Sequence, residues 1–258
     1  MWNLLRSDVY RFLHTRSTQI VTLLYVLMLI LLVSTTGVVS NTAYASFDAS
    51  TDSLSDFLIF FPKSLVFLFL VLLAHVLLVS EEYQSGYAKN LYPYVQNKWK
   101  LAASRLLSFV FIWGLFAFIS ILYSTCWLGF VCDRWGTLSA SYLIYLFAQF
   151  LYALLLSGTA TLLVHLIRGR ILPVLFVLLQ PCGVFWGLQV MLMQHFSLDY
   201  GRYLPYMLSG VLPMQWANEP YLQLFLIVGV SLLLAYIGNV LVLKKKICKK
   251  EIRCAPHT

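Results

Sequence analysis

Charged residues are scarce in this sequence of 258 residues. Asp, Glu, Lys and Arg make up 11% of it, apolar types make up 60%, and the mean hydropathy is +0.81. Soluble domains carry roughly a quarter charged residues, so the composition excludes an ordinary soluble domain. The sequence predicts an all-α membrane protein, and its apolar runs leave no room for a separate soluble domain.

Cysteine is also sparse, and its five positions do not have the spacing of a zinc or iron–sulfur site. Cys248 and Cys254 stand among lysines that we expect to face the cytoplasm, where thiols stay reduced. Cys126 and Cys132 fall at the predicted outer end of the third apolar run, where oxidation is possible. Whether these two cysteines pair stays open at this point.

The sequence lacks the motifs for nucleotide hydrolysis and for ion coupling that would let this chain drive transport by itself. No glycine is followed by lysine, so the phosphate-binding loop G-x-x-x-x-G-K-[S/T] is absent. The apolar runs hold almost no charge, and His75 and His165 stand near their predicted inner ends, so a proton or sodium relay is disfavoured. We expect no enzymatic activity and no cofactor on this chain. A separate subunit fits better as the energy source.

About 20 apolar residues cross a bilayer, and six runs of this length are present. They cover residues 18–40, 57–79, 102–130, 141–167, 171–194 and 221–243. The sequence therefore predicts a six-span membrane domain over 18–243. An interfacial helix over 1–17 precedes this domain and a basic tail over 244–258 follows it.

Basic residues gather in alternate connections between these runs. Lys63, Arg134 and Arg202 fall on one side, and the other 15 of the 18 fall on the opposite side. The positive-inside rule then places both termini in the cytoplasm of a multi-pass protein, which we expect in a bacterial plasma membrane. The net charge of +8 is thereby explained by topology and by contact with anionic lipid headgroups, and we expect no nucleic-acid partner.

Apolar residues recur at three- or four-residue steps near the N-terminus, at Trp2, Leu5, Val9 and Phe12. Arginines occupy other faces of the same helical pattern, which favours an amphipathic helix lying flat on the cytoplasmic leaflet. A disordered basic segment is the alternative. Ala43-Tyr44-Ala45 also resembles a signal-peptidase site, and cleavage there would leave five spans.

A polar interval over residues 80–105 separates the second and third runs. Ser80 is a suitable N-cap, and Glu81 and Glu82 would then lie in the first turn, where the helix dipole favours carboxylates. Pro93 cannot continue a helix. The interval therefore predicts a short cytoplasmic helix between spans 2 and 3.

The segment over 195–220, between spans 5 and 6, is aromatic and poor in charge. It also carries Pro205, Gly210, Pro213 and Trp216. A freely exposed loop would be more polar, so we expect short helices that re-enter the outer leaflet.

One enzymatic alternative is weak. Glu81-Glu82 and His195 with Asp199 are similar to motifs of membrane-embedded CAAX-type proteases. A catalytic base must lie within hydrogen-bond reach of its partner, but the charge pattern places these pairs on opposite sides, about 30 Å apart. Gly86 also occupies the position of the arginine in that motif.

The 80–105 interval resembles the permease subunits of type 2 ABC exporters, in particular small bacterial ones that expel peptide antibiotics or confer lantibiotic self-immunity. Those subunits carry E-x-x-x-G-x-x-K-N-x after span 2, followed by a proline and two basic positions. The corresponding residues here are Glu82, Gly86, Lys89, Asn90, Pro93, Lys98 and Arg105. Gln96-Asn97 departs from the pattern, which leaves the register beyond Pro93 open.

This resemblance implies a coupling helix that docks on an ATPase and transmits its motion. The implied coupling residues are Glu81, Glu82, Gly86, Lys89, Asn90, Pro93, Lys98 and Arg105. Two permeases, identical or related, would pair with two ABC ATPase subunits that bind ATP and Mg²⁺. The cargo would be an antimicrobial peptide or a similar amphipathic molecule. A non-transporting scaffold or sensor subunit and an ion-coupled carrier are the alternatives, and the coupling residues could instead be solvated charges that set topology.

Overall fold

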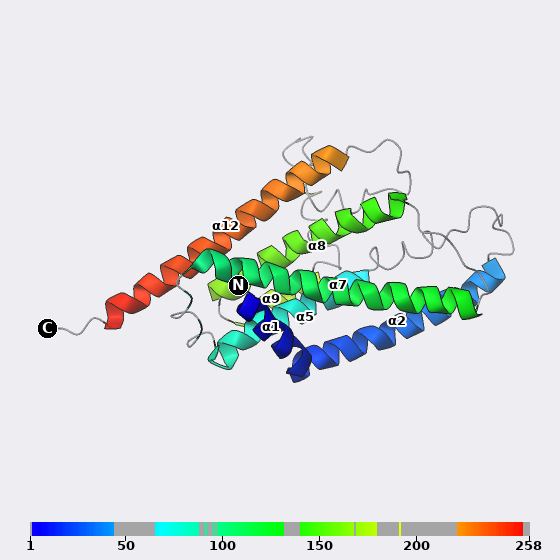
Figure 1. Ribbon diagram of the computed structural model, residues 1–258, viewed down its shortest axis with the longest axis horizontal. Helices are drawn as coiled ribbons and strands as arrows, with labels where there is room; N and C mark the ends of the chain where they lie inside the picture. Colours follow the sequence, from blue (N-terminus) through cyan, green and yellow to red (C-terminus); the bar gives the residue numbers. More distant parts are fainter. Residues whose placement is uncertain are drawn as a thin grey trace.

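The chain is described here by a computed structural model that covers residues 2–43, 65–87, 91, 95, 97–131, 140–167, 169–179, 191 and 221–254. Seven α-helices and no strand are present in these residues (Figure 1). The helices are α1 (Trp2–His14), α2 (Arg16–Ala43), α5 (Leu65–Gln84), α7 (Lys98–Val131), α8 (Ala140–Ile167), α9 (Ile171–Leu179) and α12 (Tyr221–Cys254).

Within the described ranges, three stretches of helix are long and apolar enough to cross a bilayer, at Val66–Gln84, Lys98–Trp127 and Gln149–Ile167. A fourth is present if α1 and the start of α2, which meet at a bend of 67°, form one broken span. The architecture is therefore that of a helical membrane protein. Six spans remain a prediction, because α9 accounts for only the first part of the fifth run and α12 contributes the shorter apolar stretch Val228–Lys244.

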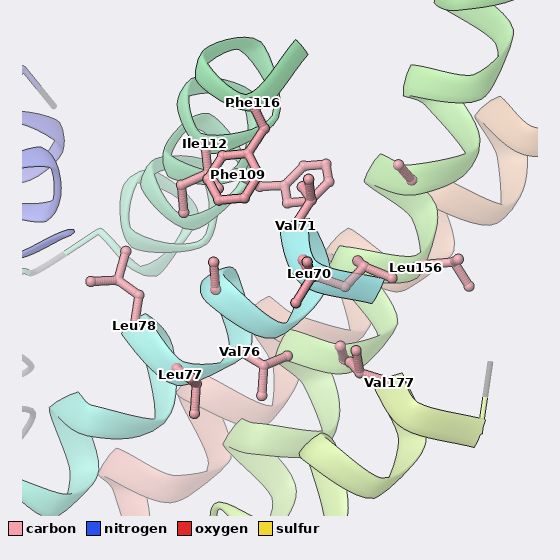
Figure 2. Packing of buried hydrophobic residues seen from close by; sticks show 14 of the residues in the cluster. Leu70, Val71, Val76, Leu77, Leu78, Phe109, Ile112, Phe116, Leu156 and Val177 are labelled. Atoms are coloured by element: carbon pink, nitrogen blue, oxygen red, sulfur yellow. The ribbon is translucent and has the colours of Figure 1, made fainter. Parts of the chain in front are cut away.

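Helix α5 lies at the centre of the packed helices. It is apolar on almost every side, which is typical of a helix surrounded by others, and Leu70, Val71 and Val76 are fully buried. Figure 2 shows Leu70 and Val71 between Phe109 on α7 and Leu156 on α8, and Val76 on the side of Val177 of α9. Five helices, α1, α2, α7, α8 and α9, contact α5, so it is enclosed by the rest of the bundle.

Helix α12 packs along α8 through small residues. A Cβ atom built on Gly158 would lie 3.6 Å from the Cβ of Ala235, and one built on Gly238 would lie 3.5 Å from Leu162. The buried Asn239 amide donates to the Gly158 carbonyl at 3.0 Å. Such close approach and interhelical hydrogen bonding are common between membrane helices. Beyond this contact, α12 continues through the lysine run to Cys254.

The N-terminal segment is helical, as α1, and its placement flat on the membrane surface stays a prediction. Phe12 is buried and meets Phe111 of α7 edge to face, whereas Trp2 is 75% exposed. The chain then turns sharply into α2, and side chains satisfy the backbone there. Thr18 donates to the Phe12 carbonyl at 2.5 Å, and the Gln19 amide donates to the Leu13 carbonyl at 2.8 Å.

The prediction that Ser80 starts a new helix is wrong. Helix α5 runs unbroken to Gln84, and the Ser80 hydroxyl donates to the Leu77 carbonyl one turn earlier, at 3.0 Å. Glu81 and Glu82 therefore lie in the last turn of α5 rather than in a first turn. The reason is that no residue before Gly86 breaks the helix, so the apolar span extends into the polar residues.

Several predictions fall on residues outside the described ranges. These are the proposed re-entrant segment over 195–220 and the positions Lys89, Asn90, Pro93 and Cys132. Cys126, which is described, is an exposed free thiol.

Candidate functional site

Two acids and two arginines from three helices meet where α1 lies beside the end of α5 and the start of α7. These residues, called the four-charge cluster below, are Asp8, Arg11, Glu82 and Arg105. Asp8 and Arg105 are each 2% exposed and Glu82 is fully buried. Figure 1 shows α1 lying beside the end of α5 and the start of α7. Buried charges at the end of a membrane helix mark a candidate site.

The carboxylate of Glu82 joins both arginines. Its Oε1 accepts from Arg11 Nη1 at 2.7 Å and lies 2.7 Å from Arg105 Nη2. Asp8 completes the cluster, because its Oδ1 accepts from Arg105 Nη1 at 2.5 Å and its Oδ2 accepts from the Ser104 hydroxyl at 3.1 Å. Arg105 therefore bridges α1 and α5 from its place on α7.

The cluster is electrically balanced, with two positive and two negative side chains. Removing a charge from water is expensive, and a buried pair offsets that cost only when both partners are present. A balanced cluster is weak evidence for added stability, but losing one member would leave an uncompensated buried charge. The arrangement therefore specifies how α1, α5 and α7 must come together.

Further contacts tie the N-terminal segment to the end of α5. Ser17 donates to Glu81 Oε2 at 3.1 Å, and the hydroxyls of Ser7 and Tyr87 lie 3.1 Å apart. The Arg11 guanidinium also sits 4.8 Å from the centre of the Tyr87 ring, a cation–π arrangement. The end of α5 and the residues after it are thus held against α1 and the first turn of α2.

Local sequence chemistry sets where the connection between α5 and α7 begins and ends. Gly86 adopts a left-handed φ of 75°, which glycine accepts without a steric penalty and which commonly follows a helix C-terminus. Asn97 caps α7, because its side-chain oxygen accepts from the Trp99 amide at 3.0 Å. Lys98 donates to the Val95 carbonyl at 2.5 Å.

The first turn of α7 is also joined to α12. The Tyr236 hydroxyl donates to the Trp99 carbonyl at 2.8 Å, and the two rings lie 5.4 Å apart. The ammonium of Lys244 lies 6.0 Å from the Trp99 ring. Aromatic and basic residues of this kind are enriched at the membrane interface.

Two histidines form polar contacts between α5 and α8. His75 Nε2 lies 3.1 Å from the Thr161 hydroxyl, and His165 Nδ1 lies 2.6 Å from the Tyr83 hydroxyl. Both histidine side chains are fully buried. These pairs give α5 a polar contact with α8 next to the four-charge cluster.

The predicted coupling residues divide into two groups. Glu82 and Arg105 come together and are buried, whereas Glu81 is partly exposed and accepts from Ser17. Gly86 and Lys98 lie at the two ends of the connection. A Cβ atom built on Gly86 meets nothing within 4 Å, so the glycine is explained by its backbone angle and not by close packing within the described part of the chain.

Sequence reasoning missed Asp8. It lies on the apolar face of α1, three residues after Leu5 and four before Phe12. An acid at such a position is a signal for a buried partner, since carboxylates are almost never buried unpaired. Its partner could not be named, because Arg105 is far along the chain.

Among the described residues, no group of three or more His, Cys, Asp or Glu side chains could hold a metal ion. Comparisons with protein-family models and with curated proteins found no match.

Proposed function

We propose that this chain is the membrane-spanning permease of an ATP-driven exporter of the type 2 ABC class. The proposal rests on the resemblance of the segment after α5 to the coupling segment of that class. It is supported by the four-charge cluster, which fastens the two ends of this segment to each other. Glu82, near the end of α5, contacts Arg105, in the second turn of α7.

A segment anchored in this way can act as a lever. Glu81 and Tyr87 bind Ser17 and Ser7 at the N-terminal side, and Trp99 binds Tyr236 of α12 at the other. A push that reaches Tyr87 or Trp99, the described residues on either side of this connection, would therefore be passed to α1, α5, α7 and α12 together. Force from an ATPase would reach several helices through side-chain contacts that are already formed.

The partners follow from this proposal. Two ABC ATPase subunits would bind ATP and Mg²⁺, and a second permease, identical or related, would complete the path. The chain would lie in a bacterial plasma membrane with both termini in the cytoplasm. Its cargo would be an antimicrobial peptide or a similar amphipathic molecule, expelled for efflux, self-immunity or resistance.

The first test is gentle isolation of the native complex from its own membrane. We expect an ATPase subunit to co-purify with the full chain and to hydrolyse ATP faster when amphipathic peptide is added. A complex that never contains an ATPase would contradict the proposal and favour a scaffold or sensor role.

A matched pair of variants tests the docking surface. Gln84 is exposed at the end of α5, and Arg170 is exposed in the connection between α8 and α9. Gln84→Trp should weaken ATPase co-purification and abolish peptide-stimulated hydrolysis, because a bulky ring would block docking. Arg170→Trp should leave both unchanged. Equal behaviour of the two variants, with equal amounts of folded protein, would argue against docking at this segment.

A further inference from the structure

A groove of about 600 Å³ runs along α2 below its bend with α1. The side chains that line it are apolar, except for those of Gln19 and Thr22. Phe12 and Leu13 of α1 form its upper end, and Leu115 of α7 contributes to its wall. The groove is separate from the four-charge cluster, which lies on the other side of Phe12 along α1.

Hydrogen bonds at the bend between α1 and α2 suit this groove to an apolar occupant. Carbonyl groups left exposed at a helix break are costly in hydrocarbon. Here the side chains of Thr18 and Gln19 donate to the carbonyls of Phe12 and Leu13. These two carbonyls, which lie where the groove begins, therefore have hydrogen-bond partners.

One face of α2 changes in polarity along the groove. This face carries, at helical spacing, Arg16, Gln19, Leu23 and Ile30. Along the helix it therefore presents first a positive charge, then an amide and then only apolar side chains. Arg16 is exposed, and the distance from it to Ile30 is about 21 Å at 1.5 Å per residue. A phospholipid has the same order of groups, with a charged headgroup, a polar linking region and an apolar acyl chain.

We propose that this groove binds one acyl chain of an anionic phospholipid, with the phosphate placed against Arg16. The lining side chains Leu23, Leu27 and Ile30 are 69%, 51% and 43% exposed, so an acyl chain would cover side chains that nothing in the described part of the protein covers. The cation at one end distinguishes this occupant from a purely apolar helix of a second copy. The inference does not depend on the proposed transport function.

The test is native mass spectrometry of the full chain, purified in detergent and titrated with phosphatidylglycerol or with phosphatidylcholine of the same acyl length. We expect one tightly held phosphatidylglycerol per chain. Leu27→Trp should fill the groove and weaken this binding at least tenfold. Leu24→Trp is the matched control, because Leu24 lies on the same helix, is 42% exposed and does not line the groove.

The headgroup is tested separately. Arg16→Gln should lower the preference for phosphatidylglycerol over phosphatidylcholine about fivefold, the effect of one basic residue near an anionic headgroup. Arg170→Gln, which changes an exposed arginine elsewhere, should not. All variants should elute as a single species with unchanged helical content. If Leu27→Trp does not elute as a single species with unchanged helical content, Leu23→Phe places a smaller ring in the same groove.

Three results would overturn the proposal. Equal lipid retention by Leu27→Trp and Leu24→Trp would show that the lipid binds elsewhere. Equal binding of both lipids by the wild type would exclude the anionic headgroup. A lipid-free dimer that Leu27→Trp dissociates would identify a second copy of the chain as the occupant.

Discussion

Arg105 donates to Asp8 at 2.5 Å although 97 positions separate the two residues in the sequence. Both side chains are 2% exposed, and Arg105 also contacts the buried Glu82. A single guanidinium therefore contacts carboxylates from two other helices, and Arg11 supplies the second positive charge. This relationship makes Arg105 the residue through which α1, α5 and α7 depend on one another.

Replacing Arg105 with glutamine should strongly destabilise the protein. The cluster would keep two carboxylates and only Arg11, and breaking a buried pair typically costs about 3–5 kcal/mol. Thermal unfolding of the purified protein in detergent measures this effect. Arg170→Gln is the control, since exposed substitutions usually change stability by less than about 0.5 kcal/mol. Similar unfolding temperatures for both variants would show that the cluster does not carry a buried charge.

Removing Asp8 and Arg105 together should be less harmful than the separate changes suggest. Asp8→Asn with Arg105→Gln leaves Glu82 paired with Arg11, which restores charge balance. Residues in direct contact commonly show coupling of about 0.5–3 kcal/mol. A double-mutant cycle on the unfolding free energy gives the coupling directly, and strictly additive losses would mean that the two side chains do not interact.

Gly86 should tolerate asparagine better than alanine. Its φ of 75° costs an ordinary L-residue roughly 1–2 kcal/mol, while asparagine visits this region more readily. Gly114 provides the comparison, because it lies within α7 and a Cβ atom there also meets nothing within 4 Å. Gly114→Ala should be neutral or slightly stabilising by the same thermal assay. A Gly86→Ala variant as stable as wild type would remove the backbone explanation.

Asn97→Ala should lower stability by about 1 kcal/mol, the usual cost of losing an N-cap. The Trp99 amide would lose the side-chain acceptor that it has at 3.0 Å. Asn97→Asp keeps an acceptor and should stay close to wild type. If alanine and aspartate behave alike, this end of α7 frays in solution and the cap contributes nothing.

The helices were largely predictable because apolar runs and breakers are local signals. The fourth run was placed at 141–167 and α8 spans Ala140–Ile167. The third run was placed at 102–130, and it lies within α7. The fifth run was expected to begin at residue 171, which is where α9 begins. Each of these follows from length, hydropathy and capping chemistry within a few residues.

The site was less predictable because its contacts are not local. Ser80 can serve as an N-cap or donate within a helix, and only the continuation of α5 decides between them. Glu82 and Arg105 were singled out for contact with a partner protein, yet each finds its counter-charge within the chain. A single sequence shows that such charges exist but not which of them pair.

The separation of Asp8 from Arg105 also bears on how the protein is made. Ribosomes add about 5–20 residues per second. Arg105 is therefore synthesised several seconds after Asp8, which lies 97 positions earlier. During that interval the counter-charge nearest to Asp8 is Arg11 on the same helix, 4.0 Å away. We therefore expect α1 to reach its final position against α7 only after the third long apolar segment has been synthesised.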